Sequence, residues 1–217
     1  RPVSSAASDV YKRQNIKLFH NKPMIAWSIE AARNSNCFDE IYVSTDDKEI
    51  ASIAQEYGAK IPFLREKELA DDFTSTQSVV KNFIDQFTKD KIVFNYVCCI
   101  YAASPFILES DIKKGLDLLF ESKSDKYVFT ATSFPFPFQR SITIDDDGYS
   151  KMSSPELFEK RSQDLPKCYH DAGQFYWASS STWIKMNNIF ENGRPLIIPN
   201  WRVQDIDNKE DLIRAEI

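Results

Sequence analysis

Short apolar segments alternate with segments of helical periodicity along most of this chain, and this alternation limits the folds it can adopt. Residues 92–101 are nearly continuously apolar, as expected of a strand covered on both faces. Apolar residues recur at helical spacing in residues 47–57, 75–87 and 110–120. Strands that alternate with helices predict βαβ units, and therefore an α/β fold with a mostly parallel sheet.

The remaining predicted elements continue this alternation except in one insertion. We expect further strands at residues 40–44, 127–132, 174–178 and 196–198, and helices starting at Pro23 and spanning 180–188 and 209–217. The alternation stops at Phe134-Pro135-Phe136-Pro137-Phe138, which cannot continue a helix or a central strand. Residues 141–152 then predict a hairpin whose turn is Asp145-Asp146-Asp147-Gly148. The aromatic residues and prolines of this insertion suit an arm that packs on another subunit.

Glycine is scarce, and this excludes several kinds of nucleotide site. The chain has only five glycines, none close to another, so it contains neither a glycine-rich phosphate loop nor a GxSxG nucleophile motif. Its only histidines are His20 and His170, which makes a multi-histidine zinc site hard to build. A nucleotide would have to be bound by carboxylates, a metal ion and ordinary loops, or by a part that this sequence lacks.

The net charge, the apolar runs and the cysteine content limit which partners and which cellular compartment we expect. The net charge of −5 argues against a nucleic-acid partner. No apolar run approaches the roughly 18 residues of a membrane span, so we expect no membrane partner. The four cysteines show no CxxC spacing, which predicts reduced thiols and a cytoplasmic protein.

Asp205-Ile206-Asp207 is the strongest candidate for chemistry. Alternate residues of an extended segment point to one side, so both carboxylates can face one cation. Mg²⁺ typically takes one or two carboxylates and completes its shell with water and substrate phosphates. Asp207 is equally placed to begin the last helix, since Asp is a preferred N-cap. These residues alone leave a metal site and a helix cap as alternatives.

Polar residues also gather where predicted strands end and helices begin. Ala103 and Ser104 follow the most apolar strand, at the edge where open α/β sheets bind ligands. Asp71 and Ser75 precede a predicted helix, where they either cap it or face a ligand. His170 lies in a polar stretch before the strand at 174–178, and a lone histidine is more often structural than functional.

Several motifs occur in an order that resembles one family. From about Asn15 to the end, these are Lys22-Pro23-Met24-Ile25, Val43-Ser44-Thr45-Asp46-Asp47, Ala102-Ala103-Ser104-Pro105 and Val203-Gln204-Asp205-Ile206-Asp207. They resemble the CMP-nonulosonate synthetases, which are cytidylyltransferases for sialic-type acids. Tyr101 stands where sialic-acid-specific members carry glutamine, and this favours the branch that acts on pseudaminic acid. The resemblance implies a Rossmann-like domain at residues 15–217 with a dimerisation insertion at 134–169.

The resemblance also implies a reaction and roles for residues. The anomeric hydroxyl of the sugar acid would attack the α-phosphorus of CTP, giving a CMP-sugar for surface glycans or flagellin and releasing pyrophosphate. Asp205 and Asp207 would be the catalytic residues that hold Mg²⁺, and the protein would be a homodimer. Implied CTP contacts are Asn15, Ser75, Ala103 and Ser104; implied sugar contacts are Tyr101, Arg140, Arg161, His170 and Gln174.

One feature of the family has no counterpart here. Its glycine-containing basic loop precedes the position of Asn15, whereas residues 1–14 contain no glycine and no strand periodicity. We expect residues 1–14 to be foreign to the domain, this chain to bind CTP weakly, and a parent protein with the loop to be active. Two alternatives stay open: a nucleotide-sugar glycosyltransferase that uses Asp205 and Asp207 as a DxD motif, and a catalytically silent dimeric module.

Overall fold

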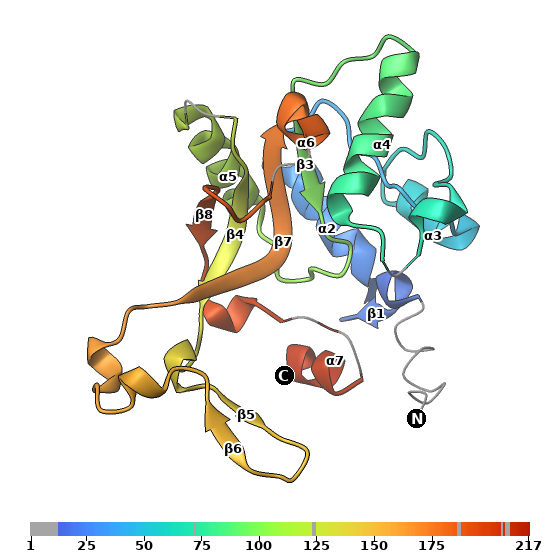
Figure 1. Cartoon of the computed structure of the whole chain (residues 1–217). Coiled ribbons are helices and arrows are strands. Elements are labelled where there is room, and N and C mark those ends of the chain that lie inside the picture. The colour runs from blue at the N-terminus through green and yellow to red at the C-terminus, as the bar shows by residue number, and fades with distance from the viewer. Residues whose placement is uncertain (1–12, 72, 123–124, 186–187, 205, 207–208) are drawn as a thin grey trace.

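A four-stranded sheet in the order β3-β7-β4-β8 organises the computed structural model, which describes residues 13–71, 73–122, 125–185, 188–204, 206 and 209–217 (Figure 1). Its strands are β3 (Tyr96–Ile100), β4 (Val128–Ser133), β7 (Tyr169–Ser179) and β8 (Arg194–Ile197). β3, β4 and β8 share one direction, while β7 is antiparallel to both of its neighbours. The expected α/β class is confirmed, and the reversed strand at the centre of the sheet is a feature that the sequence analysis did not predict.

The direction of β7 follows from the insertion that precedes it. The chain leaves β4 at Ser133 and returns at Tyr169, and these two residues pair with each other. Residues 134–168 are therefore an excursion from one end of the sheet, with no helical crossover, so the returning strand must run backwards. The β4–β7 pairing shifts register between Phe129 and Ala131, and Gly173 adopts a φ of 61° in the corresponding stretch of β7.

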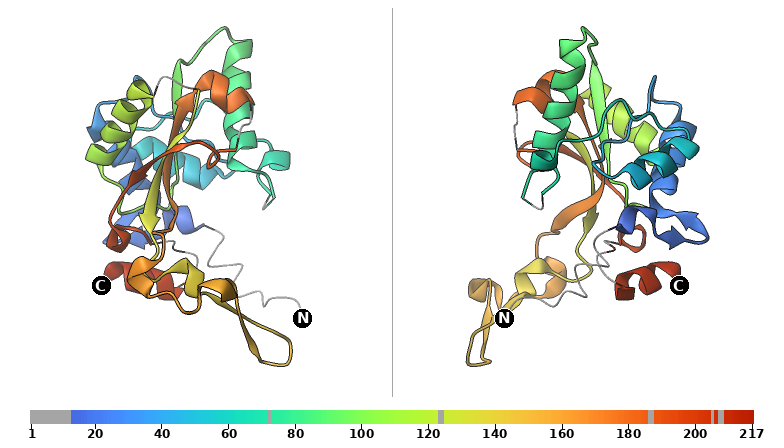
Figure 2. Two further views of the ribbon diagram at one scale, coloured as in Figure 1. Left: turned by 60° about the vertical axis from the view of Figure 1, so that its left-hand side comes forward. Right: turned by 90° about the vertical axis from the view of Figure 1, so that its right-hand side faces the viewer.

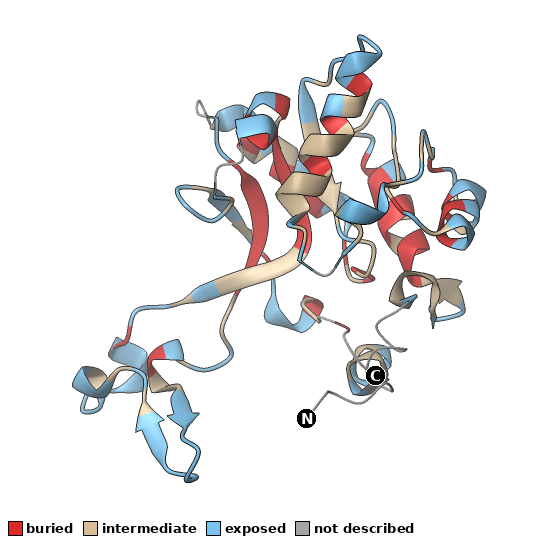
Figure 3. Ribbon diagram, turned by 45° about the vertical axis from the view of Figure 1, so that its right-hand side comes forward, coloured by how far each residue is buried: buried red, intermediate tan, exposed pale blue. Residues whose placement is uncertain are grey.

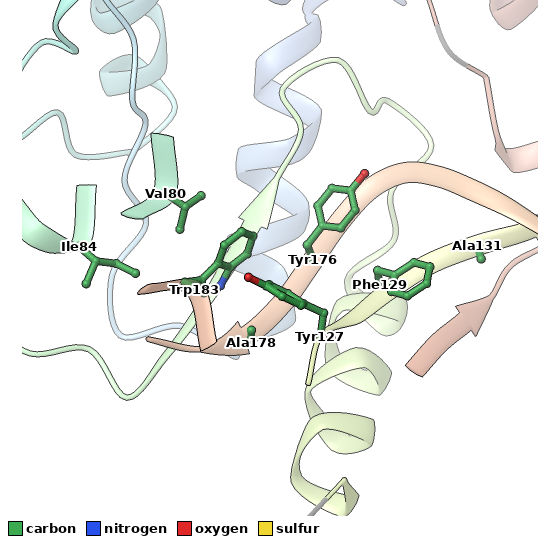
Figure 4. Packing of buried hydrophobic residues seen from close by; sticks show 8 residues of the cluster. All are labelled: Val80, Ile84, Tyr127, Phe129, Ala131, Tyr176, Ala178 and Trp183. Atoms are coloured by element: carbon green, nitrogen blue, oxygen red, sulfur yellow. The ribbon is translucent and has the colours of Figure 1, made fainter. Parts of the chain in front are cut away.

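Helices cover both faces of the sheet (Figure 2). The α-helices of the described residues are α2 (Met24–Ser35), α3 (Lys48–Glu56), α4 (Thr76–Lys89), α5 (Glu109–Glu121), α6 (Ser180–Lys185) and α7 (Lys209–Glu216). Phe175 and Trp177 of β7 pack with residues of α2 and α5. Tyr176 and Ala178 point to the opposite face, where they pack with residues of α4 and α6 (Figure 4). The alternation of side chains along one strand thus builds two separate cores.

Smaller elements complete the fold. Two hairpins are formed by β1 (Leu18–Phe19) with β2 (Lys22–Pro23) and by β5 (Ile142–Ile144) with β6 (Ser150–Met152). Short 3₁₀ helices are η1 (Gln14–Ile16), η2 (Lys67–Leu69), η3 (Phe138–Arg140), η4 (Pro155–Leu157), η5 (Ser162–Asp164) and η6 (Asn200–Arg202). Within the described residues, every helix is too short or too polar to cross a membrane.

Side-chain caps begin two of the helices, and the turn expected at residues 145–148 is confirmed. Asp47 Oδ1 accepts hydrogen bonds from the N–H groups of Glu49 and Ile50, at 2.7 and 3.2 Å, and so caps α3. Ser75 caps α4 by accepting from the Ser78 N–H at 3.2 Å. Asp145 closes the β5–β6 turn, where Gly148 has a φ of 86°. The acidic run of this hairpin is therefore turn chemistry, as expected.

Two predicted strands are shorter in the structure than expected. The strand expected at 40–44 is present only as a single parallel bridge between Tyr42 and Lys60, because its backbone hydrogen bonds go to Lys60 and not to the central sheet. The strand expected at 92–101 is shorter, since β3 begins at Tyr96. That residue pairs with Ser179, where β7 ends, so residues 92–95 have no neighbouring strand to bond.

We predict that Gly115→Ala destabilises the protein by about 1–3 kcal/mol, because a Cβ at this α5 position would overpack the core. It would lie 2.6 Å from a ring carbon of Phe175 and 3.0 Å from Trp177 Cδ1. Urea unfolding measures the effect, with exposed Lys113→Ala on the same helix as control. Helix propensity alone favours alanine over glycine. A gain in stability would therefore show that the Phe175 and Trp177 rings move aside without a loss of packing energy.

Candidate functional site

The loop after β3 (residues 101–104, the β3 loop) is hydrogen-bonded to β7 at the edge of the sheet formed by the carboxyl end of β3. The Tyr101 N–H donates to Gln174 O at 3.0 Å, and Ser104 Oγ donates to Gly173 O at 3.1 Å. Ser28 Oγ of α2 donates to Tyr101 O at 2.8 Å. The β3 loop is thus fixed from two sides at the edge where open α/β sheets bind ligands. Ser104 is buried and its hydroxyl is hydrogen-bonded within the protein. The expected contact of Ser104 with CTP stays a prediction.

The N-terminus of α4 lies against this loop. Tyr101 Oη is 2.8 Å from Thr76 Oγ1, the first residue of α4, and Ser75 Oγ is 2.9 Å from Ser78 Oγ. Hydrogen bonds from the Thr74 side chain and from the N–H groups of Phe73 and Thr74 hold the pKa of the Asp71 carboxyl below its ordinary value. Asp71 therefore closes the turn before the helix and Ser75 caps it, while the contact of Ser75 with CTP stays a prediction.

Two tyrosines and an aspartate form a polar network beside the β3 loop. Tyr176 Oη donates to Asp171 Oδ2, and the rings of Tyr101 and Tyr176 have centroids 5.3 Å apart. Burial raises the pKa of both phenols, that of Tyr176 far above its ordinary value. Both hydroxyls therefore stay protonated at neutral pH and act as hydrogen-bonding groups. Neither is suited to be a general base.

Two of the expected sugar contacts are occupied within the insertion. Arg140 Nη1 donates to Phe158 O at 2.8 Å, and its Nη2 donates to Lys160 O. Arg161 pairs with Asp164, with Nε and Oδ2 2.8 Å apart, and its side chain is 72% exposed. Both guanidinium groups thus have partners inside the insertion. Their role as sugar ligands stays a prediction.

His170 and Gln174 occupy different environments on β7. His170 Nδ1 lies 2.8 Å from Asp171 O, and its ring packs against Phe134. Gln174 is only 3% exposed, and its Nε2 donates to Arg202 O at 2.9 Å. Its Oε1 is buried and has no partner among the described residues. The side chain of Gln174 thus points to η6 and not to an open surface.

The expected metal ligands Asp205 and Asp207 lie outside the described residues. Ile206 between them is described: it is 3% exposed and belongs to a core cluster against which Ala103 packs. Two carboxylates are a donor set that suits Mg²⁺, which leaves its remaining positions to water and substrate oxygen atoms. Among the described residues, no three His, Cys, Asp or Glu side chains gather to hold a metal ion.

Asn15 lies in η1, half-buried. The neighbouring Ile16 packs against the same core cluster as Ala102 of the β3 loop. Sequence analysis missed Arg65, whose N–H donates to Thr45 O at 2.8 Å and whose buried Nε has no partner among the described residues. Its Nη2 lies 3.8 Å from Asp46 Oδ1, which holds the guanidinium group beside the Val43–Asp47 motif. The sequence signal for it is weak, since one arginine in a polar loop is ordinary.

This chain is similar to several known proteins. The family model described as Cytidylyltransferase matches residues 7–160. A pseudaminic acid cytidylyltransferase of Campylobacter jejuni is 40% identical over 206 residues, covering 94% of this chain and 88% of that protein. A CMP-N,N'-diacetyllegionaminic acid synthase of Legionella pneumophila is 32% identical, covering 82% and 74%.

A solved structure supports the same fold. The structure of CMP:2-keto-3-deoxy-manno-octonic acid synthetase, complexed with CTP, superposes with a TM-score of 0.66 at 14% identity. It covers 93% of this chain and 90% of that one. At this level of identity the likeness concerns the fold alone. The boundary expected at Asn15 stays a prediction.

Proposed function

The chain belongs to the cytidylyltransferase family and is a nucleotidyltransferase, and on that premise we propose that it activates pseudaminic acid with CTP. The products would be the CMP-sugar and pyrophosphate. The choice of sugar is carried by the 40% identity, over nearly the whole chain, to the Campylobacter jejuni relative. The relatives named above are cytidylyltransferases or CMP-sugar synthases, which disfavours the glycosyltransferase alternative.

The geometry of the sheet edge supports nucleotide binding there. The β3 loop, the N-terminus of α4 and buried Ile206 converge on this edge. Backbone N–H groups and hydroxyls at such an edge suit phosphate oxygens. The phenols of Tyr101 and Tyr176 stay protonated, so they add hydrogen bonds without adding negative charge near a triphosphate.

The reaction itself depends on alignment and charge neutralisation. The anomeric oxygen forms a bond to the α-phosphorus while the bond from this phosphorus to the pyrophosphate oxygen breaks, so the protein must hold the two reactants in line. Asp205 and Asp207 are the residues that would hold Mg²⁺. When bound, Mg²⁺ supplies charge neutralisation and lowers the pKa of the attacking hydroxyl.

The test is a substrate panel. The assay uses the chain extended, ahead of Asn15, by the strand and the glycine-containing basic loop that the family resemblance implies (the extended chain). We expect pyrophosphate release with CTP and pseudaminic acid, and kcat/KM lower by about tenfold or more with N-acetylneuraminic acid, since a pocket rejects a substrate that leaves its polar groups unpaired. Release that does not depend on a sugar acid, or sugar transfer from a CMP-sugar to a glycan, would contradict the proposal.

For the metal, we predict that Asp207→Ala in the extended chain lowers Mg²⁺-dependent turnover by about a hundredfold or more, because a metal ion supplies several kcal/mol of charge stabilisation. Circular dichroism checks that the variant is folded. Asp117→Ala, at an exposed position of α5, is the matched control. Full activity of Asp207→Ala would mean that this carboxylate only caps a helix.

We also propose that the insertion joins two copies of the chain. It extends away from the sheet and is largely exposed (Figure 3). Its exposed side chains include Phe136 at 79%, Ile144 at 70%, Tyr149 at 74% and Phe158 at 65%. An apolar surface of this kind on a projecting arm suits an interface with a second copy.

The dimer is tested by light scattering after gel filtration. We predict twice the chain mass for the wild type and a monomer for Ile144→Asp/Tyr149→Asp, because exposed charges disrupt an apolar interface without entering the core. Phe73→Asp, at a 94% exposed position outside the insertion, should leave the mass unchanged. A wild type that stays monomeric at micromolar concentration would refute the proposal.

A cytoplasmic location is proposed on the state of the thiols. All four cysteines are free. Burial raises the pKa of Cys99 to about 12, and that of Cys98 well above its ordinary value. Protonated thiols of this kind suit a reducing compartment.

A further inference from the structure

Gln174 connects two segments that the sequence analysis treated separately. Its backbone O accepts from the Tyr101 N–H of the β3 loop at 3.0 Å, and its side-chain Nε2 donates to Arg202 O at 2.9 Å. Its own N–H donates to Thr130 Oγ1 at 3.3 Å, which fixes the residue within the sheet. One buried residue of β7 thus holds both the β3 loop and the end of η6.

Arg202 is held a second time by its side chain. Its Nη1 donates to Asp111 Oδ2 of α5 at 2.6 Å, with the two side chains only 9% and 7% exposed. Ion pairs this deeply buried bind strongly only when their geometry is good, and they fix a segment in one arrangement. The Val203 N–H donates to Asn200 O at 3.0 Å, so the next residue also starts from a fixed position.

Residues 203–207 (the acidic segment) begin at this anchored point. Ile206 forms a second anchor, because it is buried in the cluster against which Ala103 and Phe106 pack. The acidic segment is therefore held at its start by η6 and near its end by the core beside the β3 loop.

We propose that Arg202 is a positioning residue: held by Asp111 and Gln174, it fixes the start of the acidic segment beside the β3 loop, so that the carboxylates of this segment meet Mg²⁺ carried by CTP. The proposal rests on the function proposed above and assigns Gln174 to this task instead of to sugar binding. Residues that orient metal ligands typically change metal affinity or activity by about 10- to 100-fold when they are mutated.

The first test compares two glutamines in matched environments. Gln174 and Gln139 are both buried, each donates Nε2 to a carbonyl oxygen, and each has a buried Oε1 without a partner among the described residues. Leucine at either position removes this hydrogen bond. Gln139 Nε2 also donates to Cys168 Sγ at 3.2 Å, so Gln139→Leu should cost at least as much stability as Gln174→Leu. Gln139 donates to Pro166 O at 3.0 Å within the insertion, away from the acidic segment.

The readout is the affinity gained from Mg²⁺. CTP is titrated calorimetrically into the extended chain, without sugar acid, once in Mg²⁺ and once in EDTA. We expect Gln174→Leu to reduce this gain by about 10-fold or more, while Gln139→Leu leaves it unchanged. In the turnover assay, Gln174→Leu should raise the Mg²⁺ concentration at half-maximal rate by a similar factor. The inference is overturned if Mg²⁺ strengthens CTP binding by Gln174→Leu as much as it does for the wild type. It is also overturned if this Mg²⁺ effect is reduced equally in Gln174→Leu and Gln139→Leu.

The second test separates the side chain of Arg202 from plain stability. Arg202→Met/Asp111→Leu replaces the buried pair by apolar groups, which often keeps stability near the wild type. We expect this double variant to fold and to show a smaller increase in CTP affinity with Mg²⁺. Arg202→Lys keeps the charge beside Asp111 and should retain more of that increase. A double variant with the full Mg²⁺ gain would show that the ion pair does not position the segment.

Failure of the two proposals gives different results. If Mg²⁺ strengthens CTP binding but no sugar acid supports turnover, the proposed substrate is wrong and the titrations still decide the positioning. If Mg²⁺ does not strengthen CTP binding by the wild type, the metal part of the proposed function is wrong and the inference falls with it.

Discussion

The pairing of β7 with both β3 and β4 is the constraint on which the rest of the structure depends. This strand runs against its neighbours because the chain returns from the insertion at the point where it left the sheet. Its alternating side chains, from Phe175 to Ala178, build the cores on both faces. Directly before Phe175 on the same strand, Gly173 and Gln174 accept hydrogen bonds from the β3 loop. Folding of the core and placement of the site are therefore one event.

This arrangement separates the groups that position from the groups that would react. Gln174, Arg202 and Asp111 are buried and bonded to one another, so they have little to offer a substrate directly. They join a β7 residue, the start of α5 and the end of η6 into one rigid unit. The acidic segment and the β3 loop both leave from this unit. Rigid support of this kind is what holds metal ligands near a productive geometry.

Local sequence patterns predicted much of the fold, but they did not predict which strands pair or in which direction. The helices capped by Asp47 and Ser75 follow from sequence because a cap acts within a few residues. The reversed direction of β7 did not, since it depends on where the chain re-enters the sheet. In the site, the β3 loop followed from the strand before it. The task of Gln174 depends on Arg202, a residue distant in sequence, and hydrophobic periodicity carries no record of such a contact.

Transfer of the cytidylyl group to a sugar acid is the central claim, and tracing the phosphorus atoms of CTP tests it most directly. The extended chain is incubated with Mg²⁺, pseudaminic acid and CTP labelled with ³²P at either the α- or the γ-position. Attack at the α-phosphorus predicts that the α-label moves onto the sugar, while the γ-label appears only in pyrophosphate. A γ-label on the sugar, or an α-label that stays in free nucleotide while pyrophosphate accumulates, would contradict the account.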